Sequence, residues 1–324
     1  MSESEPAPQD ANRWQAADAV LLLTAAVWGI NILVFKYVDR GNDLFSFNAL
    51  RLVLALTTLT VLTIAELIIW PFTKPKLGVP WARVIFFSVL NGLLYLLIFV
   101  NAVPMTTAGN IALILASLPM WTALISLVLL KERLPRVTWI GLIVTFFGTI
   151  IVTIGEVNLS SSYFVGNMLM LIATICWAGA TVASKPIMTS LTPLQLATIS
   201  SWLTVPIHVM IALKGIPAAI EKLESPSFFW AVVYSGVCST GIAYATWNAG
   251  VRMVGASHAA VFQNVVTLVA VLGGWLALGE KLMLAQILGG VLTVVGLFLM
   301  RRGRPSSPHA TGLENPDSPP SREK

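Results

Sequence analysis

The chain has 324 residues, of which 56% are hydrophobic and only 11% are charged, and its mean hydropathy is +0.81. This composition is too apolar for an ordinary soluble domain and indicates an integral membrane protein. The net charge of +5 does not indicate a nucleic-acid partner, because the basic residues lie in short gaps between apolar runs rather than in one patch.

A bilayer core of about 30 Å is crossed by roughly 20 apolar residues in a helix. The first apolar run is too long for a signal peptide and is expected to remain in the protein. The Pro-, Ser- and charge-rich ends, 1–15 and 301–324, are expected to be disordered. In chain order, the expected spans are 16–38, 45–69, 82–103, 108–130, 137–154, 163–187, 193–213, 227–249, 256–278 and 283–300.

The loop charges predict the direction of insertion, because cytoplasmic loops carry an excess of Lys and Arg. If the N-terminus is inside, eleven basic residues fall in cytoplasmic segments and four in external loops. We therefore expect both termini in the cytoplasm. The short loops and the lack of an organelle signal favour a bacterial inner membrane as the location.

The chain contains two similar halves, 16–154 and 163–300. An offset of 148 residues aligns the last two spans of each half, and an offset of 149 aligns the first spans and superposes Trp28 on Trp177. Because each half has five expected spans, an odd number, the second half must enter the membrane from the opposite side. Inverted repeats of this kind are typical of secondary transporters, whose substrate lies near the midplane between the halves.

Several polar and aromatic side chains lie inside the expected spans, where a lipid-facing amide is disfavoured. Thr24, Trp28, Asn31 and Phe35 share one helix face, which should point to protein or to a cavity. Arg51 lies roughly two turns inside the outer end of the second span. Its guanidinium must reach the interface, a carbonyl or a substrate anion.

Other polar and small residues favour structural roles. Lys36 and Lys185 lie near span ends, so each can either reach the headgroups or face the transport path. Glu132 and Glu280 precede the fifth and tenth spans, and each is expected to favour the positive end of the helix that follows it. Glycines seven residues apart on one face predict close helix packing. These glycine pairs are Gly141 with Gly148 and Gly289 with Gly296.

Residues and motifs that the sequence lacks disfavour several classes of function. No Asp or Glu lies near the middle of a span, so the embedded carboxylate of a proton-coupled exporter of cationic drugs is not expected. A basic, aromatic and amide-lined interior suits zwitterionic or anionic solutes better. The sequence has no Walker loop, GxSxG elbow, HExxH motif or Cys/His metal spacing, and predicts no enzyme, cofactor or metal site.

The stretches WGINILVFK and AYATWNAG, the KERL and GEKL hairpins and the duplicated five-span unit resemble EamA-type transporters of the drug/metabolite transporter superfamily. The resemblance covers about residues 16–300. It implies an all-α fold of ten transmembrane helices, arranged as two inverted five-helix repeats around a central cavity. It also implies export or exchange of small metabolites, often amino acids, by alternating access.

The resemblance points to a substrate site between the halves. In this hypothesis Trp28 and Trp177 pack against the solute, and an outer Arg51 attracts a carboxylate. The expected partners are the small-molecule substrate and membrane lipids, and the chain is expected to act as a monomer or homodimer. The full set of expected substrate-binding side chains is Trp28, Asn31, Arg51, Tyr95, Trp177, Tyr244, Trp247 and Asn248.

Two other functions stay open at this level. An exchanger of phosphorylated or nucleotide-linked metabolites would need several basic residues at the midplane, whereas the lysines here lie near span ends. A non-transporting receptor or assembly scaffold would use the same bundle to bind a partner. That function would be favoured by a large soluble domain or a long patterned tail, and neither is expected.

Overall fold

The chain has the helical architecture of a multi-pass membrane protein. The computed structural model describes residues 8–129, 135–154, 162–254 and 262–302, and every regular element in these ranges is a helix. Within these ranges, eight helical stretches are long and apolar enough to cross a membrane. Two shorter apolar helices, Asn264–Leu278 and Leu284–Met300, follow them in the chain.

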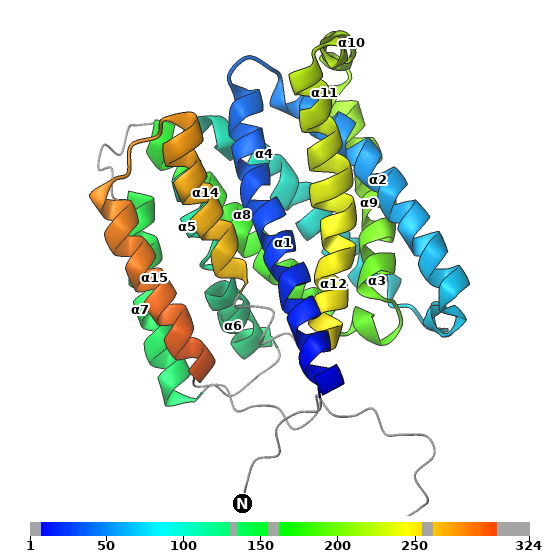
Figure 1. The fold of residues 1–324 in the computed structure, drawn as a ribbon, viewed down its shortest axis with the longest axis horizontal. Coiled ribbons are helices and arrows are strands. Elements are labelled where there is room, and N and C mark those ends of the chain that lie inside the picture. Colours follow the sequence, from blue (N-terminus) through cyan, green and yellow to red (C-terminus); the bar gives the residue numbers. More distant parts are fainter. Residues whose placement is uncertain (1–7, 130–134, 155–161, 255–261, 303–324) are drawn as a thin grey trace, which may run out of the picture.

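The helices stand side by side and run mostly between the two ends of one bundle (Figure 1). The beginning of the first helix and the end of the last lie at the same end of this bundle. In chain order the main elements are α1 (Pro8–Asp39), α2 (Leu44–Ile69), α3 (Trp81–Phe87), η2 (Ser88–Tyr95), α4 (Leu96–Ala102), α5 (Ala108–Leu115), α6 (Leu118–Leu129), α7 (Arg136–Ile154), α8 (Ser162–Ser184), α9 (Pro193–Ala212), α10 (Ile216–Glu221), α11 (Pro226–Val233), η6 (Tyr234–Ile242), α12 (Ala243–Val254), α14 (Gln263–Leu278) and α15 (Leu284–Arg302).

Helix α1 begins earlier than its composition predicts. It starts at Pro8, inside the segment 1–15 that is expected to be disordered. Proline is favoured in the first turn of a helix, because its missing N–H has no partner there in any case. At the other end of the chain, residues 303–324 of the expected tail lie outside the described part.

The expected span 108–130 is broken into two helices. Helix α5 ends at Leu115 and α6 begins at Leu118. The cause is Pro119, which has no N–H to donate and whose ring clashes with the carbonyl four residues earlier, that of Leu115. The hydroxyl and the backbone N–H of Ser117 both donate to the Ile114 carbonyl, at 2.6 and 3.0 Å.

Two spans widen into π-helix at related positions. The first π segment, η2, lies between α3 and α4, and the second, η6, lies between α11 and α12. Tyr95 ends the first segment and Tyr244 follows the second closely, and they are 149 residues apart (244 − 95 = 149). π-Helical turns are rare and are often found at functional sites.

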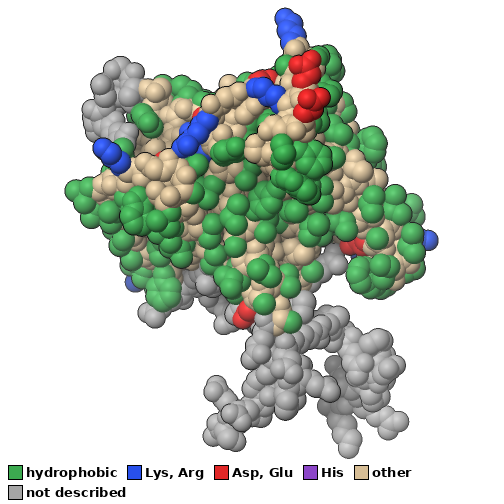
Figure 2. Space-filling view, turned by 45° about the horizontal axis from the view of Figure 1, so that its top comes forward, with side chains coloured by type: hydrophobic (Ala, Val, Ile, Leu, Met, Phe, Trp, Pro, Cys, Tyr) green, Lys and Arg blue, Asp and Glu red, His purple; other side chains and the backbone are tan. Residues whose placement is uncertain are grey.

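The outer surface of the bundle is apolar. Ile68, Val128 and Leu276 are each 72% exposed. Figure 2 shows hydrophobic side chains over the middle of the visible face, with charged side chains mostly along its upper rim. Because a large exposed apolar surface is unfavourable in water, this surface is suited to contact with lipid.

Helices α7 and α15 pack directly on each other through their glycines. A Cβ atom added at Gly141 would lie 2.5 Å from the carbonyl oxygen of Gly296, and one added at Gly148 would lie 2.7 Å from that of Gly289. The two backbones therefore meet with no room for side chains. The packing role predicted for these four glycines is confirmed.

Gly148→Leu is expected to lower the free energy of unfolding by about 1–3 kcal/mol or more, because the added side chain overpacks this contact. Thermal unfolding of the purified protein in detergent would measure the loss. Gly41→Leu is the matched control, because a Cβ at Gly41 meets nothing within 4 Å. Equal losses of Tm in the two variants would contradict the packing role.

Candidate functional site

Arg51 is a buried cation on the second membrane-spanning helix. It lies about 10 Å along α2 from the first residue of that helix, at 1.5 Å per residue, and is only 3% exposed. Its Nε and Nη2 donate to Asn48 Oδ1 at 3.0 and 2.8 Å. Its Nη1 donates to the hydroxyl of Thr240, on η6, at 3.0 Å. The guanidinium thus ties α2 to the eighth span.

Asn48 extends this network to two more helical segments. Its Nδ2 lies 3.3 Å from Nδ1 of His208, a residue of α9 that is 2% exposed. The other ring nitrogen of His208, Nε2, lies 2.8 Å from the carbonyl oxygen of Gly92, on η2. A line of hydrogen bonds therefore runs from Arg51 to the π-helical backbone of the third span.

No carboxylate of the described residues forms an ion pair with Arg51. The ion pair found among the described residues joins Lys36 and Asp39. A guanidinium carries five N–H donors, and three of those of Arg51 are used by Asn48 and Thr240. One N–H on Nη1 and one on Nη2 remain for another acceptor. A cation buried within a membrane span without a counter-charge is suited to bind an anion.

Aromatic rings extend from Arg51 into the bundle. The guanidinium carbon lies 4.7 Å from the centre of the Phe35 ring, and Phe35 packs edge-on against Phe99 at 5.1 Å. Tyr95 lies 5.9 Å from Phe99 and 5.1 Å from Trp177, between ring centres. The structure thus brings the predicted residues Arg51, Tyr95 and Trp177 into one cluster.

A second cluster joins α1 to the eighth span. The rings of Trp28 and Trp247 lie 5.0 Å apart, and the Trp28 Nε1 donates to the carbonyl of Ser239 at 3.0 Å. The hydroxyls of Thr24 and Thr246 lie 2.9 Å apart beside this pair. Trp28 and Trp247, two more of the predicted residues, are therefore in direct contact.

Asn31 lies between the two clusters. It is one helical turn from Trp28 and one from Phe35 on the same face of α1. Its Oδ1 is buried and has no hydrogen-bond partner among the described residues. Leaving a buried acceptor unpaired costs about 1–3 kcal/mol, so this oxygen is a ready acceptor for a donor on a bound solute.

Both π segments contribute backbone carbonyls to these contacts. The carbonyl of Gly92 on η2 meets His208, and the carbonyl of Ser239 on η6 accepts from Trp28. Each segment therefore bonds a side chain from a helix outside its own span. This is consistent with a role of the π-helical turns at the site.

The remaining predicted residues are less well connected to the clusters. Tyr244 is half-buried on α12 and is not without a partner. The side chain of Asn248 lies outside the described part of the chain. Lys36 donates to the carbonyl of Val103 at 2.9 Å, so it bonds the end of the third span.

A separate polar network holds helix ends together. Glu280 Oε1 accepts from the backbone N–H of Ala108 at 2.9 Å, so it caps α5. The sequence instead predicts that it favours the start of α15, the helix that follows it. The prediction is wrong because the loop before α15 brings this carboxylate to the free N–H groups of a different helix. Gln286 Nε2 donates to Asn110 Oδ1 at 2.8 Å in the same network. Glu132 lies outside the described residues.

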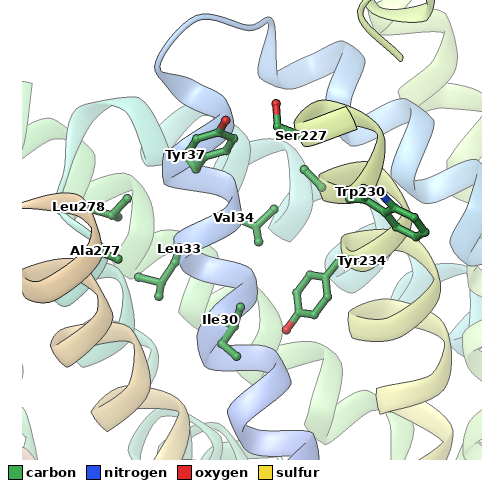
Figure 3. Close-up of a pocket in the computed structure, with 10 residues that line it drawn as sticks. Ile30, Leu33, Val34, Tyr37, Ser227, Trp230, Tyr234, Ala277 and Leu278 are labelled. Atoms are coloured by element: carbon green, nitrogen blue, oxygen red, sulfur yellow. The ribbon is translucent and has the colours of Figure 1, made fainter. Parts of the chain in front are cut away.

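A groove of about 400 Å³ opens on the side of the bundle between α1, α11, η6 and α14 (Figure 3). Its walls are mostly apolar, and Tyr234 reaches across to α1, where its hydroxyl donates to the carbonyl of Val27 at 2.8 Å. None of the eight predicted site residues lines it. The groove is therefore separate from the two interior clusters.

Asn48, Thr240 and His208 belong to the candidate site by their contacts, although the sequence pattern does not predict them. Asn48 lies one turn before Arg51 on the same helix face, a spacing that could have identified it. The other two come from distant spans. His208 is an imidazole in an apolar run, which is itself a signal for a residue that faces the interior.

A model of the EamA-like transporter family matches residues 15–154 and, a second time, residues 164–302. A crystal structure with a TM-score of 0.61 covers 88% of this chain and 97% of its own. Its sequence is 18% identical, so the similarity shows a shared fold.

Several transporters are similar over most of their length. An uncharacterized transporter of Archaeoglobus fulgidus is 26% identical over 88% of this chain and 98% of its own. The uncharacterized transporter YoaV of Bacillus subtilis is 23% identical over 86% and 94%. A probable amino-acid metabolite efflux pump of Escherichia coli is 24% identical over 87% and 94%.

Asn48→Leu is expected to lower the free energy of unfolding by about 1–3 kcal/mol, because Arg51 loses a buried acceptor and His208 a donor. The comparison is Asn101→Leu, since Asn101 is exposed and bonds only the carbonyl of Leu97 on its own helix in the described contacts. Thermal unfolding in detergent checks both variants. If Asn48→Leu unfolded at the same temperature as Asn101→Leu, the network would contribute nothing to stability.

Proposed function

The chain belongs to the EamA-like transporter family, and on that premise we propose that it exports or exchanges amino acids or similar zwitterionic or anionic solutes by alternating access. The observation that carries the proposal is the buried guanidinium of Arg51, which has no carboxylate partner among the described residues. No enzymatic activity is proposed, because the family is one of transporters.

Arg51 is suited to a carboxylate. Its two remaining N–H groups lie on different nitrogens of one planar guanidinium, and such a fork matches the two oxygens of a carboxylate. Hydrogen bonds to charged groups are the strong ones in proteins, at about 1.5–3 kcal/mol each. An anionic group on the solute would supply the charge that the surrounding protein does not.

A zwitterion would also use Asn31, whose Oδ1 has no partner among the described residues. The buried Oδ1 of Asn31 accepts hydrogen bonds only, and an ammonium group has only donors to offer. The faces of Trp28 and Trp177 are suited to pack against the apolar part of such a solute. The similarity to the probable amino-acid metabolite efflux pump of Escherichia coli supports the same solute class.

We propose that ten helices form two inverted halves, which rock about the site between them. The double match to the family model and the π-helical segments at related positions support two equivalent halves. Helices from both halves meet in the bundle, as α1 does with α14 and α2 with α9. Movement between such halves would expose the site to one side of the membrane at a time.

The proposed location is the inner membrane of a bacterium, with both termini in the cytoplasm and the chain acting as a monomer or homodimer. The excess of basic residues in the corresponding loops supports this orientation. The ends of the described chain lie on one side of the bundle, which is consistent with it (Figure 1).

A carrier of phosphorylated metabolites is the less favoured function. Such a solute carries more negative charge and is usually bound by several cations. In the described contacts Lys36 bonds the carbonyl of Val103 and pairs with Asp39, and Lys185 lies 3.5 Å from the hydroxyl of Ser126. Arg51 is therefore the cation available to a solute in the candidate site.

The transport function is tested by overexpressing the protein in bacterial cells and measuring amino acids and related metabolites inside and outside them. We expect the wild type to raise the external concentration of one such class. Arg51→Gln should reduce the export rate about tenfold or more, because a charged hydrogen bond worth at least 1.4 kcal/mol is lost. The Trp28→Ala, Trp247→Ala double variant should also lose export.

Trp275→Ala is the control, because Trp275 is 50% exposed on the outer face of α14 and should export like the wild type. Membrane levels of all variants are compared by immunoblot. Wild-type export by both Arg51→Gln and the double variant would show that the site is misassigned. An unchanged metabolite profile with the wild type in the membrane would contradict the proposed export.

A further inference from the structure

The hydrogen bonds near Arg51 have a fixed direction. His208 Nε2 lies 2.8 Å from the carbonyl oxygen of Gly92. A carbonyl oxygen can only accept, so the proton of His208 is on Nε2. Its other ring nitrogen, Nδ1, faces Asn48 and is left as an acceptor.

The orientation of Asn48 follows from its other neighbour. One atom of the Asn48 amide meets two donors of Arg51, at 3.0 and 2.8 Å, and so must be the oxygen. The amide nitrogen then faces His208 Nδ1 and donates to it. Every donor in the line points from Arg51 toward Gly92, and this arrangement holds His208 in its neutral form.

A second proton on His208 is incompatible with this arrangement. A proton on Nδ1 would meet the NH₂ group of Asn48, a donor against a donor. The conflict is relieved when the amide of Asn48 turns over, so that its oxygen accepts from Nδ1–H. The NH₂ group then faces Arg51, and the guanidinium loses both of its bonds to Asn48.

We propose that His208 is a proton-binding site that controls Arg51 through Asn48. On protonation, an N–H bond forms at Nδ1 of His208 and an O–H bond of a hydronium ion breaks, which leaves a neutral water molecule. The guanidinium of Arg51 is released from Asn48 and presents more N–H donors to the solute. His208 is thus a positioning residue that acts on the anion-binding group.

For the nature of the anion, this inference rests on the proposed function. A carboxylate accepts the N–H groups that Asn48 gives up, and it also neutralises the added positive charge. Proton and solute therefore favour each other's binding, and by linkage the effect is reciprocal.

The surroundings of His208 contain few charges that could act instead. Helix α9 packs against α2, η2, α3 and α12. Glu66 accepts from the hydroxyl of Thr192 at the start of α9, about 24 Å along that helix from His208. Arg83 is exposed, and the side chain of Arg252 lies outside the described part. The charged and titratable side chains described on these four elements are Arg51, Glu66, Arg83, Tyr95 and Tyr244.

The switch is tested without any solute by NMR of the full chain in lipid nanodiscs, labelled with ¹⁵N in histidine and arginine side chains. Spectra are recorded from about pH 8 down to about pH 4. Neutral His208 should carry its proton on Nε2, and its ring signals should report protonation within this range. The Arg51 Nε resonance should shift with the same midpoint. The chain has three histidines, so the His258→Gln, His309→Gln double variant retains His208 alone and identifies its signal.

His208→Gln should make the Arg51 Nε resonance independent of pH, and Arg51→Lys identifies that resonance. The wild-type spectrum decides the proposal even if a variant fails to fold. A titration of His208 that leaves Arg51 Nε unmoved would overturn it. The absence of titration in this range, or a neutral form with the proton on Nδ1, would do the same.

Transport in proteoliposomes with a mixture of radiolabelled L-amino acids separates this proposal from the proposed function. The initial rate at a low solute concentration is measured at several pH values, each equal on the two sides of the membrane. The wild-type rate should fall as the pH rises and His208 loses its proton, because Arg51 then offers fewer N–H groups to the solute, whereas the rate of His208→Gln should not change with pH. The same pH dependence in both proteins would overturn the control of Arg51 by His208. No transport by the wild type would contradict the proposed function, while the response of Arg51 in the spectra still decides the switch.

Discussion

A hydrocarbon layer offers no hydrogen bonds, so each polar group inside it must find a partner within the protein. The helices of this chain meet most of that requirement alone. Threonine hydroxyls bond the carbonyl four residues earlier, as Thr145 does with Gly141. Groups that cannot be satisfied on their own helix, the guanidinium of Arg51 above all, determine which segments face one another in the interior. The fold and the candidate site therefore depend on the same constraint.

The positions of the helices could largely be predicted, because the length of an apolar run nearly fixes where it can cross a bilayer. The second span is expected at 45–69, and α2 runs from Leu44 to Ile69. The break after Leu115 does not follow from the apolar run, because a count of apolar residues gives no weight to the missing N–H of Pro119. The early start of α1 does not follow from composition either, because polar residues that predict disorder can still extend a helix.

The candidate site could be predicted only in part. The sequence shows which side chains are costly in lipid, and this reasoning finds Arg51 and Asn31. It does not show partners, because Arg51 and Thr240 are brought together by the packing of distant spans. For the same reason Glu280 is assigned to the wrong helix, since the nearest helix in the sequence is not the nearest in space. Whether the eight expected residues bind a solute stays a prediction.

The π-helical segments have a consequence for the evolution of chain length. A π turn holds one more residue than an α turn, so a one-residue deletion within Ser88–Tyr95 can be absorbed by a local return to α-helix, with the residues after it kept on their present faces. The same deletion in α7 would rotate every later residue of that helix by about 100° and turn Gly148 away from α15. Related chains are therefore expected to gain and lose single residues in the two widened turns, and to keep a constant length where the glycines meet.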